Sequence, residues 1–351
     1  MKKTIKHILV IRFRRVGDSV LATSLCSSLK KSFPEAQVDF VLNDNIISLY
    51  DNHPDIDRII SFNNEENHSI RKYLLRVRQV MRETDYDVII DMRSTIKTLW
   101  FSLFSLHTPY RIGTKKRYNF LIHNHRIDNH KDNSLDMVQH NLALLKPLEK
   151  ESKIVYDPAF RLYVSKDEKS RFRSYMEQQG IDFSKPVILA SVVTRVADKM
   201  WSLSLMKEVL FRIIDKYEPQ IIFNYTGTKE EELAKRLFRE MECDSHLFVN
   251  IQADALSDLR AMIANCDFFF GNEGGPRHIV QALDIPSYAI YSPGISKSVW
   301  LPEDGDKFQG IEAGDNKNPE EVRATADGHT AVSVDEVWSG VSPMLDKYLK
   351  K

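Results

Sequence analysis

The sequence predicts an α/β protein with two doubly wound domains that follow one another along the chain. Short β-branched and aromatic runs alternate with longer amphipathic segments, the pattern of βαβ units around a parallel sheet. This alternation begins near the N-terminus and starts again after a polar stretch around 150–185. The chain has 351 residues, which is more than a single hydrophobic core usually supports.

The N-terminal half carries the first set of strand and helix patterns. Apolar, β-branched runs predict strands over 7–13, 36–42, 57–62 and 86–92. Helical spacing of apolar residues predicts helices over 18–33, 66–83 and 95–106. Residues 107–160 are less regular, and a helix within 131–148 is the one element predicted there. We place the domain boundary near residue 160.

The C-terminal half repeats the pattern. Strands are predicted over 186–193, 220–227, 247–251, 267–271 and 287–293. The sequence beyond 300 is polar and loop-like until a final helical segment. The expected organisation is a first domain over 1–160, a second over 161–333, and a C-terminal helix over 334–351 that packs on the first domain.

Composition excludes several classes of protein. Lys plus Arg and Asp plus Glu each total 49, so net charge favours neither a nucleic acid nor an acidic partner. The three cysteines have no metal-ligand spacing and no disulfide framework, which is typical of a cytosolic protein with buried thiols. No apolar stretch reaches the ~18–20 residues of a membrane span, and we expect a cytoplasmic protein without a metal site.

Ligands of doubly wound sheets bind in the turns that follow the strands, and the first such turn is "RFRRVGDSV". Gly17 permits a tight turn. Asp18 is either a helix N-cap or a general base that accepts a proton from a sugar hydroxyl. Arg12, Arg14 and Arg15 crowd the same turn, where they are either solvated or suited to a phosphate-bearing ligand.

Two turns of the second half have compositions that suit a nucleotide. Lys199 in "TRVADKMWS" precedes a helix start, where a lysine is unfavourable unless an anion lies between them. A solvated lysine is the alternative. In "NYTGTKEEEL", Thr228 belongs to the turn, and Glu230 and Glu231 favour the helix dipole. A carboxylate at this place can also bind ribose hydroxyls.

The glycine-rich turn "GNEGGPRH" ends another predicted strand. Gly271, Gly274 and Gly275 let the backbone approach a ligand closely, and Pro276 suits the first position of a helix. The free N–H groups of that helix can then meet a diphosphate, with His278 in the same turn.

These turns together resemble those of the bacterial heptosyltransferases, glycosyltransferase family nine, which have the GT-B fold. The family's R-x-x-x-x-G-D turn is matched by Arg12 to Asp18, and its R-I-G segment starts here at Arg111. Its D-L-Q/R-G segment with a following basic residue is matched loosely by "DMRSTIK" with Lys97. Its T-x-x-K-x-W motif is matched with one extra residue between Thr194 and Lys199, and "GNEGGPRH" matches its phosphate turn. The resemblance covers 7–295.

The resemblance implies two Rossmann-like domains facing a central cleft, the first for the acceptor and the second for the nucleotide sugar. It makes Asp18 the base and Lys199 a catalytic partner of the donor diphosphate. The donor-binding residues it implies are Thr194, Lys199, Thr228, Glu230, Glu231, Asn272, Glu273, Gly274, Gly275, Pro276 and His278. The acceptor-binding residues it implies are Arg14, Arg15, Gly17, Lys97 and Arg111.

The implied reaction is an inverting sugar transfer by direct displacement, without metal or cofactor. The donor is expected to be ADP-heptose and the acceptor a lipopolysaccharide core or related lipid-linked glycan, at the cytoplasmic face of the inner membrane. Glu273 and Gly274 depart from the family's Asp and Ser/Thr. The alternatives are therefore a different nucleotide sugar and a non-catalytic nucleotide-sugar-binding homologue. An NAD-dependent enzyme is disfavoured, because no G-x-G-x-x-G follows the first strand.

Overall fold

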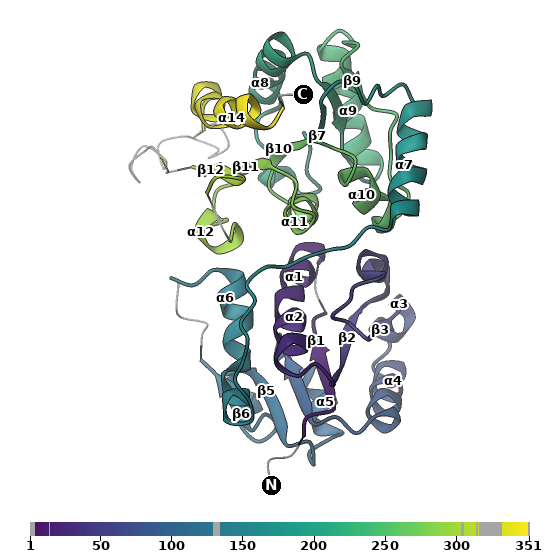
Figure 1. Cartoon of the computed structure of the whole chain (residues 1–351), viewed down its shortest axis with the longest axis vertical. Helices are drawn as coiled ribbons and strands as arrows, with labels where there is room; N and C mark the ends of the chain where they lie inside the picture. The colour runs from purple at the N-terminus through teal and green to yellow at the C-terminus, as the bar shows by residue number, and fades with distance from the viewer. Residues whose placement is uncertain are drawn as a thin grey trace. The chain divides into compact units, whose positions relative to one another are not determined.

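The computed structural model describes residues 4–13, 15–128, 134–302, 305–313, 315 and 332–349. The chain divides into two compact units, Met1–Tyr163 and Val164–Lys351 (Figure 1). The division lies close to the boundary that the change to polar composition indicated.

The first unit is built on a six-stranded parallel sheet in the order β3-β2-β1-β4-β5-β6. Its strands are β1 His7–Ile11, β2 Gln37–Asn43, β3 Arg58–Phe62, β4 Val88–Asp91, β5 Tyr110–Thr114 and β6 His125–Ile127. Its helices are α1 Val16–Leu21, α2 Thr23–Ser32, η1 Asp44–Tyr50, α3 Asn64–His68, α4 Ile70–Glu83, α5 Leu99–Leu103, η2 Arg117–Asn119, α6 Met137–Leu142 and η3 Ala143–Lys150. The apolar run of β1 is buried because β2 and β4 flank it on both sides.

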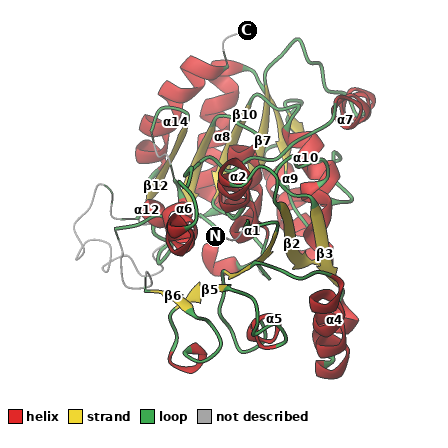
Figure 2. Ribbon diagram, turned by 60° about the horizontal axis from the view of Figure 1, so that its bottom comes forward, coloured by secondary structure: helices red, strands yellow, loops and turns green. Residues whose placement is uncertain are grey.

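The second unit has the same topology, with the strand order β12-β11-β10-β7-β8-β9. Its strands are β7 Val187–Ser191, β8 Gln220–Phe223, β9 Leu247–Phe248, β10 Phe268–Asn272, β11 Ser287–Tyr291 and β12 Phe308–Glu312. Its helices are α7 Lys166–Gln178, η4 Ala197–Lys199, α8 Leu203–Tyr217, α9 Thr228–Glu240, α10 Leu256–Ile263, α11 Gly275–Ala282, α12 Lys297–Trp300 and α14 Val334–Tyr348. Figure 2 shows helices lying against both sheets.

Three strands fall where the sequence predicted none. β5 and β6 lie within 107–160, where the sequence predicts a single helix, and β12 lies in the polar region beyond 300. β6 and β12 are edge strands, which need fewer apolar residues because one side has no neighbouring strand. Their short, partly polar sequences therefore lack the buried-strand pattern.

The C-terminal helix α14 packs in the core of the second unit, so the expectation that it packs on the first domain is wrong. Val337, Val341 and Leu345 are fully buried in that unit's core, which also contains residues of α8. The hydroxyl of Tyr217, at the end of α8, donates to the Asp346 carboxylate. The apolar face of α14 is thus used inside its own unit, so the expected boundary at 333 does not separate two bodies.

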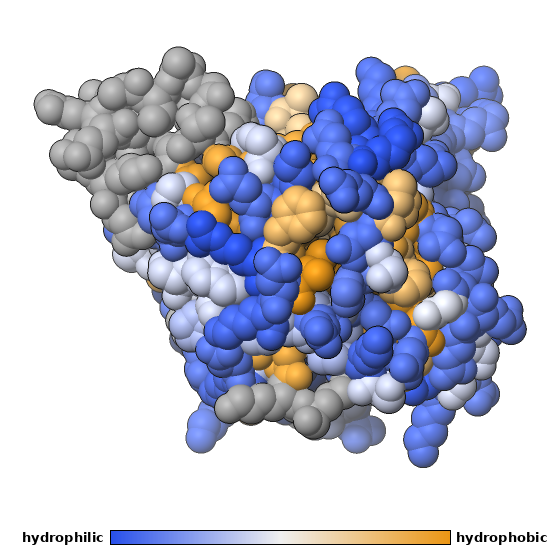
Figure 3. All heavy atoms as spheres, turned by 90° about the horizontal axis from the view of Figure 1, so that it is seen from above, coloured by the Kyte–Doolittle hydropathy of each residue, from blue (hydrophilic) through white to orange (hydrophobic). Residues whose placement is uncertain are grey.

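The strand orders determine which turns are neighbours. In the first unit β1 pairs with β4, so the turns after these two strands lie side by side at the carboxyl edge of the sheet. In the second unit β7 pairs with β10, and the same holds for their turns. These are the points at which doubly wound sheets bind ligands. The face in Figure 3 is mostly hydrophilic, with hydrophobic areas scattered between.

Candidate active site

The turn after β1 leads directly into α1 and brings Asp18 into the helix. Arg15 occupies the N-cap position, and its side chain makes no capping bond. Asp18 is the third residue of α1, so the alternative that it is the N-cap is wrong. Gly17 is the second helical residue and has no positive φ, so the turn does not depend on its conformational freedom. Arg14 lies outside the described residues.

Asp18 is buried and forms an ion pair with Arg12. The Nη2 atom of Arg12 donates to Oδ1 of Asp18 at 2.8 Å, and its Nη1 donates to the Met92 carbonyl at 3.2 Å. Burying a carboxylate is costly unless a charged partner compensates it, and Arg12 is that partner here. Arg12 therefore orients Asp18 and ties the turn after β1 to the turn after β4. Arg15 is exposed.

Asp91, the last residue of β4, shapes the turn that carries the "DMRSTIK" motif. Its Oδ1 accepts hydrogen bonds from the backbone N–H groups of Arg93 and Ser94, at 3.0 and 2.8 Å. The backbone of Ser94 has a φ of 49°, which residues other than glycine rarely adopt without such support. Complete burial raises the pKa of Asp91 to about 6, against these hydrogen bonds.

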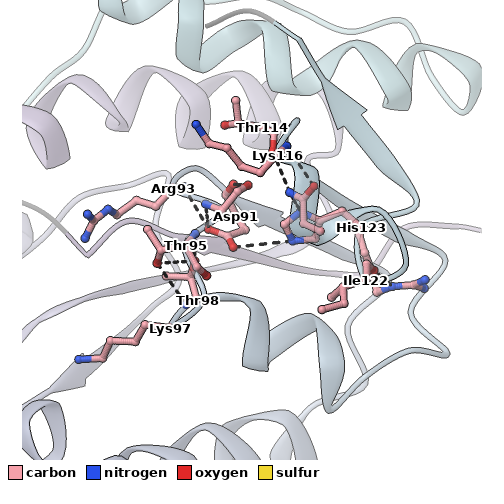
Figure 4. Close-up of polar contacts among 12 residues, drawn as sticks. Asp91, Arg93, Thr95, Lys97, Thr98, Thr114, Lys116, Ile122 and His123 are labelled. Atoms are coloured by element: carbon pink, nitrogen blue, oxygen red, sulfur yellow. Dashed lines mark hydrogen bonds and ion pairs between the residues drawn. The ribbon is translucent and has the colours of Figure 1, made fainter.

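His123 reaches the other oxygen of Asp91, as Figure 4 shows. The side-chain amide nitrogen of Asn119 donates to the Thr114 carbonyl. The same nitrogen lies 3.1 Å from Nδ1 of His123. Nδ1 must therefore accept, which leaves the proton on Nε2, 3.7 Å from Oδ2 of Asp91. Burial, with the charges of Arg111 and Arg126, lowers the pKa of His123 to about 4. A Cβ on Gly113 would lie 2.2 Å from this ring, so the R-I-G segment leaves room for it.

The substitution His123→Gln is expected to destabilise the protein most at neutral pH. Burial holds the pKa of His123 at about 4, below the 6.5 of an exposed histidine. The unfolded chain therefore takes up the proton first as the pH falls, and the wild type loses stability between these two values. The variant lacks this loss, so its stability deficit should shrink by ~3 kcal/mol between pH 7 and pH 4.

Urea unfolding of both proteins across this pH range measures the effect. Asp91 is present in both, so its own titration is common to the two curves. A deficit that stays constant with pH would contradict the buried neutral state of His123.

Lys97 and Arg111 use hydrogen-bond donors inside the first unit. The Lys97 ammonium donates to the Asn67 backbone carbonyl and side-chain oxygen, and it lies 4.5 Å from the Tyr73 ring centre. Burial, with the charge of Arg93, lowers its pKa. The Arg111 guanidinium donates to three backbone carbonyls, those of Leu106, Thr108 and Ile122. Arg111 therefore joins two loops of the unit.

In the second unit, Asn272 fixes the position of the Lys199 loop. Its Oδ1 accepts from the Trp201 backbone N–H at 2.7 Å, and its Nδ2 donates to the Ser191 carbonyl at 2.9 Å. Asn272 is buried, and this single side chain connects the ends of β10 and β7 to the segment before α8. The geometry makes it a support for the loop.

Lys199 lines a small pocket at the carboxyl edge of the second sheet. Trp201, Asn272 and Tyr291 are among the residues that line it. Among the described residues, none forms an ion pair with the Lys199 ammonium. Thr194, earlier in the same loop, donates its hydroxyl to the Val196 carbonyl. Within the described residues, this edge therefore presents an ammonium without an ion-pair partner, although its charge contributes to lowering the pKa of Glu273.

Glu273 and His278 lie close together where α11 begins. Nε2 of His278 lies 3.5 Å from the Glu273 carboxylate, and the buried Arg277 guanidinium donates to Nδ1 of His278. Burial alone would raise the pKa of Glu273, but the hydrogen bond from His278 and the charges of Arg277 and Lys199 hold it below its usual range. Glu273 therefore stays ionised between cationic groups.

Helix α11 starts at Gly275, with Pro276 as its second residue instead of the first. Its N-cap, Gly274, makes no side-chain cap, so the first N–H groups have no side-chain partner from that position. The positive end of this helix and the Lys199 loop lie at the same edge, because β7 and β10 are paired.

The turn after β8 leads into α9 with Gly227 at the N-cap and no side-chain cap. Gly227 has a φ of 79°, which favours glycine, and α9 begins at the exposed Thr228. The Glu230 carboxylate accepts from the Thr226 backbone N–H, and burial raises its pKa. Glu231 forms an ion pair with Lys235 at 2.6 Å. Both carboxylates thus have local partners.

The glycines of the "GNEGGPRH" turn have different roles, and a pair of alanine substitutions should separate them. Gly271 has a φ of 129°, and a Cβ there would lie 2.4 Å from the Ser191 carbonyl oxygen. Gly271→Ala is therefore expected to lower the free energy of unfolding by ~3 kcal/mol or more. A Cβ on Gly274 would meet only Pro276, at 3.8 Å, on extended backbone. Gly274→Ala should leave stability within ~0.5 kcal/mol.

Denaturant unfolding measures both effects. The two variants are matched in chemistry and differ by three positions in sequence, so equal losses would contradict this distinction. Gly271 is needed for strand packing, whereas the space beside Gly274 is open to a ligand.

Sequence reasoning missed Arg277, Asn119 and His123, although Arg277 stands inside a quoted motif. No local sequence pattern marks an arginine as buried. Asn119 and His123 could not be found from local sequence because the group they support, Asp91, lies 25 or more residues away in the chain. Within the described ranges, no group of His, Cys, Asp or Glu side chains has the arrangement of a metal site. Nor does any described helix have the length and apolar character needed to cross a bilayer.

The sequence model of glycosyltransferase family 9 (heptosyltransferase) matches residues 74–322. Lipopolysaccharide heptosyltransferase 1 of Campylobacter coli is 23% identical over 293 residues, which cover 81% of this chain and 83% of that protein. The family 9 glycosyl transferase structure from Veillonella parvula superposes with a TM-score of 0.84 at 16% identity, covering 99% of each chain. The E. coli ADP-heptose lps heptosyltransferase II superposes with a TM-score of 0.74 at 21% identity, covering 97% and 99%. The expected fold, two Rossmann-like domains of the GT-B type, is confirmed.

Proposed function

We propose that this chain, which belongs to glycosyltransferase family 9 (heptosyltransferase), moves a heptose from ADP-heptose to a lipopolysaccharide core or related lipid-linked glycan. The observation that carries the donor half is that Lys199 lines a pocket with Asn272, at the same sheet edge as the uncapped start of α11. A cation and a helix N-terminus at one edge suit an anionic diphosphate. The names of its relatives support both substrates, since they include a lipopolysaccharide heptosyltransferase and an ADP-heptose enzyme.

The second unit is proposed to bind the donor. The N–H groups at the start of α11 and the Lys199 ammonium hold the diphosphate, and the open backbone at Gly274 allows close approach. Glu273 and His278 contact the phosphate or the donor sugar. Glu230, Glu231 and Thr228 border the ribose, as acidic residues do after the second strand of other nucleotide-binding sheets.

The first unit is proposed to bind the acceptor and to supply the base. The acceptor hydroxyl oxygen attacks the anomeric carbon of the donor, and its proton passes to the Asp18 carboxylate. The bond from that carbon to the diphosphate oxygen breaks with inversion, and ADP leaves with its charge met by Lys199 and α11. No metal or cofactor enters this sequence of bonds.

Calorimetry with ADP-, UDP- and GDP-sugars, followed by transfer assays, tests the proposal. We expect an ADP-sugar to bind best and heptose to appear on the acceptor with inverted configuration. Preference for UDP- or GDP-sugars would move the enzyme to another donor.

A non-catalytic nucleotide-sugar-binding homologue is the second candidate. It is favoured by Glu273, whose carboxylate faces His278, and by Gly274, which offers no hydroxyl. Nucleotide binding without transfer across a panel of donors and acceptors would support it.

Basic residues of the first unit are proposed to meet acceptor phosphates at the cytoplasmic face of the inner membrane, where the protein works peripherally. Arg14, Arg15 and the segment 111–117 supply them. Arg15→Glu is expected to raise the acceptor KM roughly tenfold without changing donor affinity. A roughly tenfold change corresponds to the binding free energy of about one charge-assisted hydrogen bond. Kinetics with varied acceptor, beside donor calorimetry, measures this split. Equal losses for both substrates would contradict it.

A further inference from the structure

Seven large apolar side chains of the first unit are exposed on two neighbouring segments. They lie in and around α5 and after β5: Ile96, Leu103, Phe104, Leu106, Tyr118, Phe120 and Leu121. Ile96 is 70% exposed, Phe120 58% and Leu121 76%. Single exposed apolar residues are ordinary, but a concentration of this kind marks a surface that contacts another body. We call these seven residues the apolar surface.

Hydrogen bonds hold the two segments together. The Arg111 guanidinium donates to the Leu106 carbonyl on one segment and to the Ile122 carbonyl on the other. The Tyr118 hydroxyl donates to the Ser94 carbonyl at 2.9 Å. Figure 2 shows α5 and the loop after β5 on the same side of this unit. The apolar surface is therefore a fixed feature of the fold.

The charge of the surrounding chain has one sign. Residues 92–127 contain Arg93, Lys97, Arg111, Lys115, Lys116, Arg117 and Arg126, and no Asp or Glu. This imbalance stands in a protein whose total charges cancel. Lys115 and Arg117 are exposed beside the apolar surface. Asp128 pairs with Lys115 at the border of the segment.

We propose that the apolar surface and the basic residues around it dock the first unit on a bilayer that contains anionic phospholipids. Aromatic and aliphatic side chains insert at the level of the headgroups, and the cations meet lipid phosphates. A protein partner would have to offer a large apolar face rimmed only by acids, whereas an anionic bilayer offers both properties everywhere. The docking is argued without the proposed function. The inference rests on that function only where it states that the docked protein meets its acceptor in the membrane.

Flotation with vesicles of phosphatidylethanolamine and phosphatidylglycerol, free of any acceptor, tests the docking. The full chain is expected to float with them, less so at high salt, and not with phosphatidylcholine vesicles. The triple variant Ile96→Ser, Phe120→Ser, Leu121→Ser is expected to bind at least ~10-fold more weakly, since it removes most of the insertable area. Lys115→Gln with Arg117→Gln should weaken binding ~10-fold and reduce its dependence on salt.

Matched substitutions outside the surface provide the controls. Val155→Ser changes another exposed apolar residue of the same unit, and Lys146→Gln with Lys153→Gln removes two exposed charges there. Both controls should float like the wild type. The midpoint of urea unfolding should be unchanged for every variant, because all these side chains are on the surface.

Three results would overturn the inference. They are no flotation of the wild type with acceptor-free anionic vesicles, equal flotation of the triple variant, and a self-association in sedimentation that only the triple variant abolishes. Transfer to a lipid-free oligosaccharide acceptor separates the two proposals. The triple variant should keep the wild-type rate on it. Flotation without transfer would sink the proposed function alone, and transfer without flotation would sink the docking alone.

Discussion

Asp18→Asn is expected to lower kcat by ~10²–10⁴-fold, the contribution of a positioned general base. The amide keeps the shape of the side chain but cannot take a proton from the acceptor hydroxyl. Its oxygen can still accept from Arg12, which the wild-type carboxylate contacts at 2.8 Å. The substitution therefore tests proton transfer with little change in geometry. Steady-state transfer assays with saturating donor and acceptor measure it.

Two comparisons distinguish a loss of proton transfer from a disturbed site geometry. Arg12→Lys keeps a cation near Asp18 but loses the fork that also contacts the Met92 carbonyl, so it should slow transfer less than Asp18→Asn. Donor binding by calorimetry should be unchanged in Asp18→Asn, since the donor residues lie in the second unit. Full transfer activity of Asp18→Asn would show that another group takes the proton.

Lys199→Met is expected to lower kcat by ~10²–10³-fold and to weaken donor binding. The methionine fills a similar volume without the charge that stabilises the departing diphosphate. The effect should be large because the Lys199 ammonium forms no ion pair within the described residues and Lys199 lines the pocket at the carboxyl edge of the second sheet. Transfer assays and calorimetry with ADP measure the two parts.

Lys166→Met is the matched control for this variant. Lys166 is an exposed lysine in α7 of the same unit. It should leave transfer and donor binding at wild-type values. If Lys199→Met binds ADP normally and transfers at full rate, the diphosphate is held elsewhere.

The places of the candidate turns could be predicted because they follow from local patterns. Apolar runs identified β1, β7 and β10, and the residues after each run identified the turns. The edge strands β6 and β12 could not be found this way, since their environment on one side is solvent. The motif residues lie at strand ends, as the sequence predicts, but the contacts that each side chain makes could not be predicted.

Asn272 and Gly271 illustrate that limit. Both belong to the motif that indicated a ligand site, yet Asn272 supports the Trp201 backbone and Gly271 clears the Ser191 carbonyl. Their partners are 71 and 80 positions away in the chain. Only the pairing of β10 with β7 brings these groups together.

By itself, the sequence determined two α/β domains, the positions of their strand-end turns and the chemical types of residue in them. These properties depend on periodicity and turn chemistry within a few residues. The tertiary structure alone decided that Arg12 holds Asp18, that His123 faces Asp91, and that Asn272 holds the Lys199 loop. Each of these depends on the order of strands in a sheet, because that order sets which distant side chains share one buried, weakly screened space.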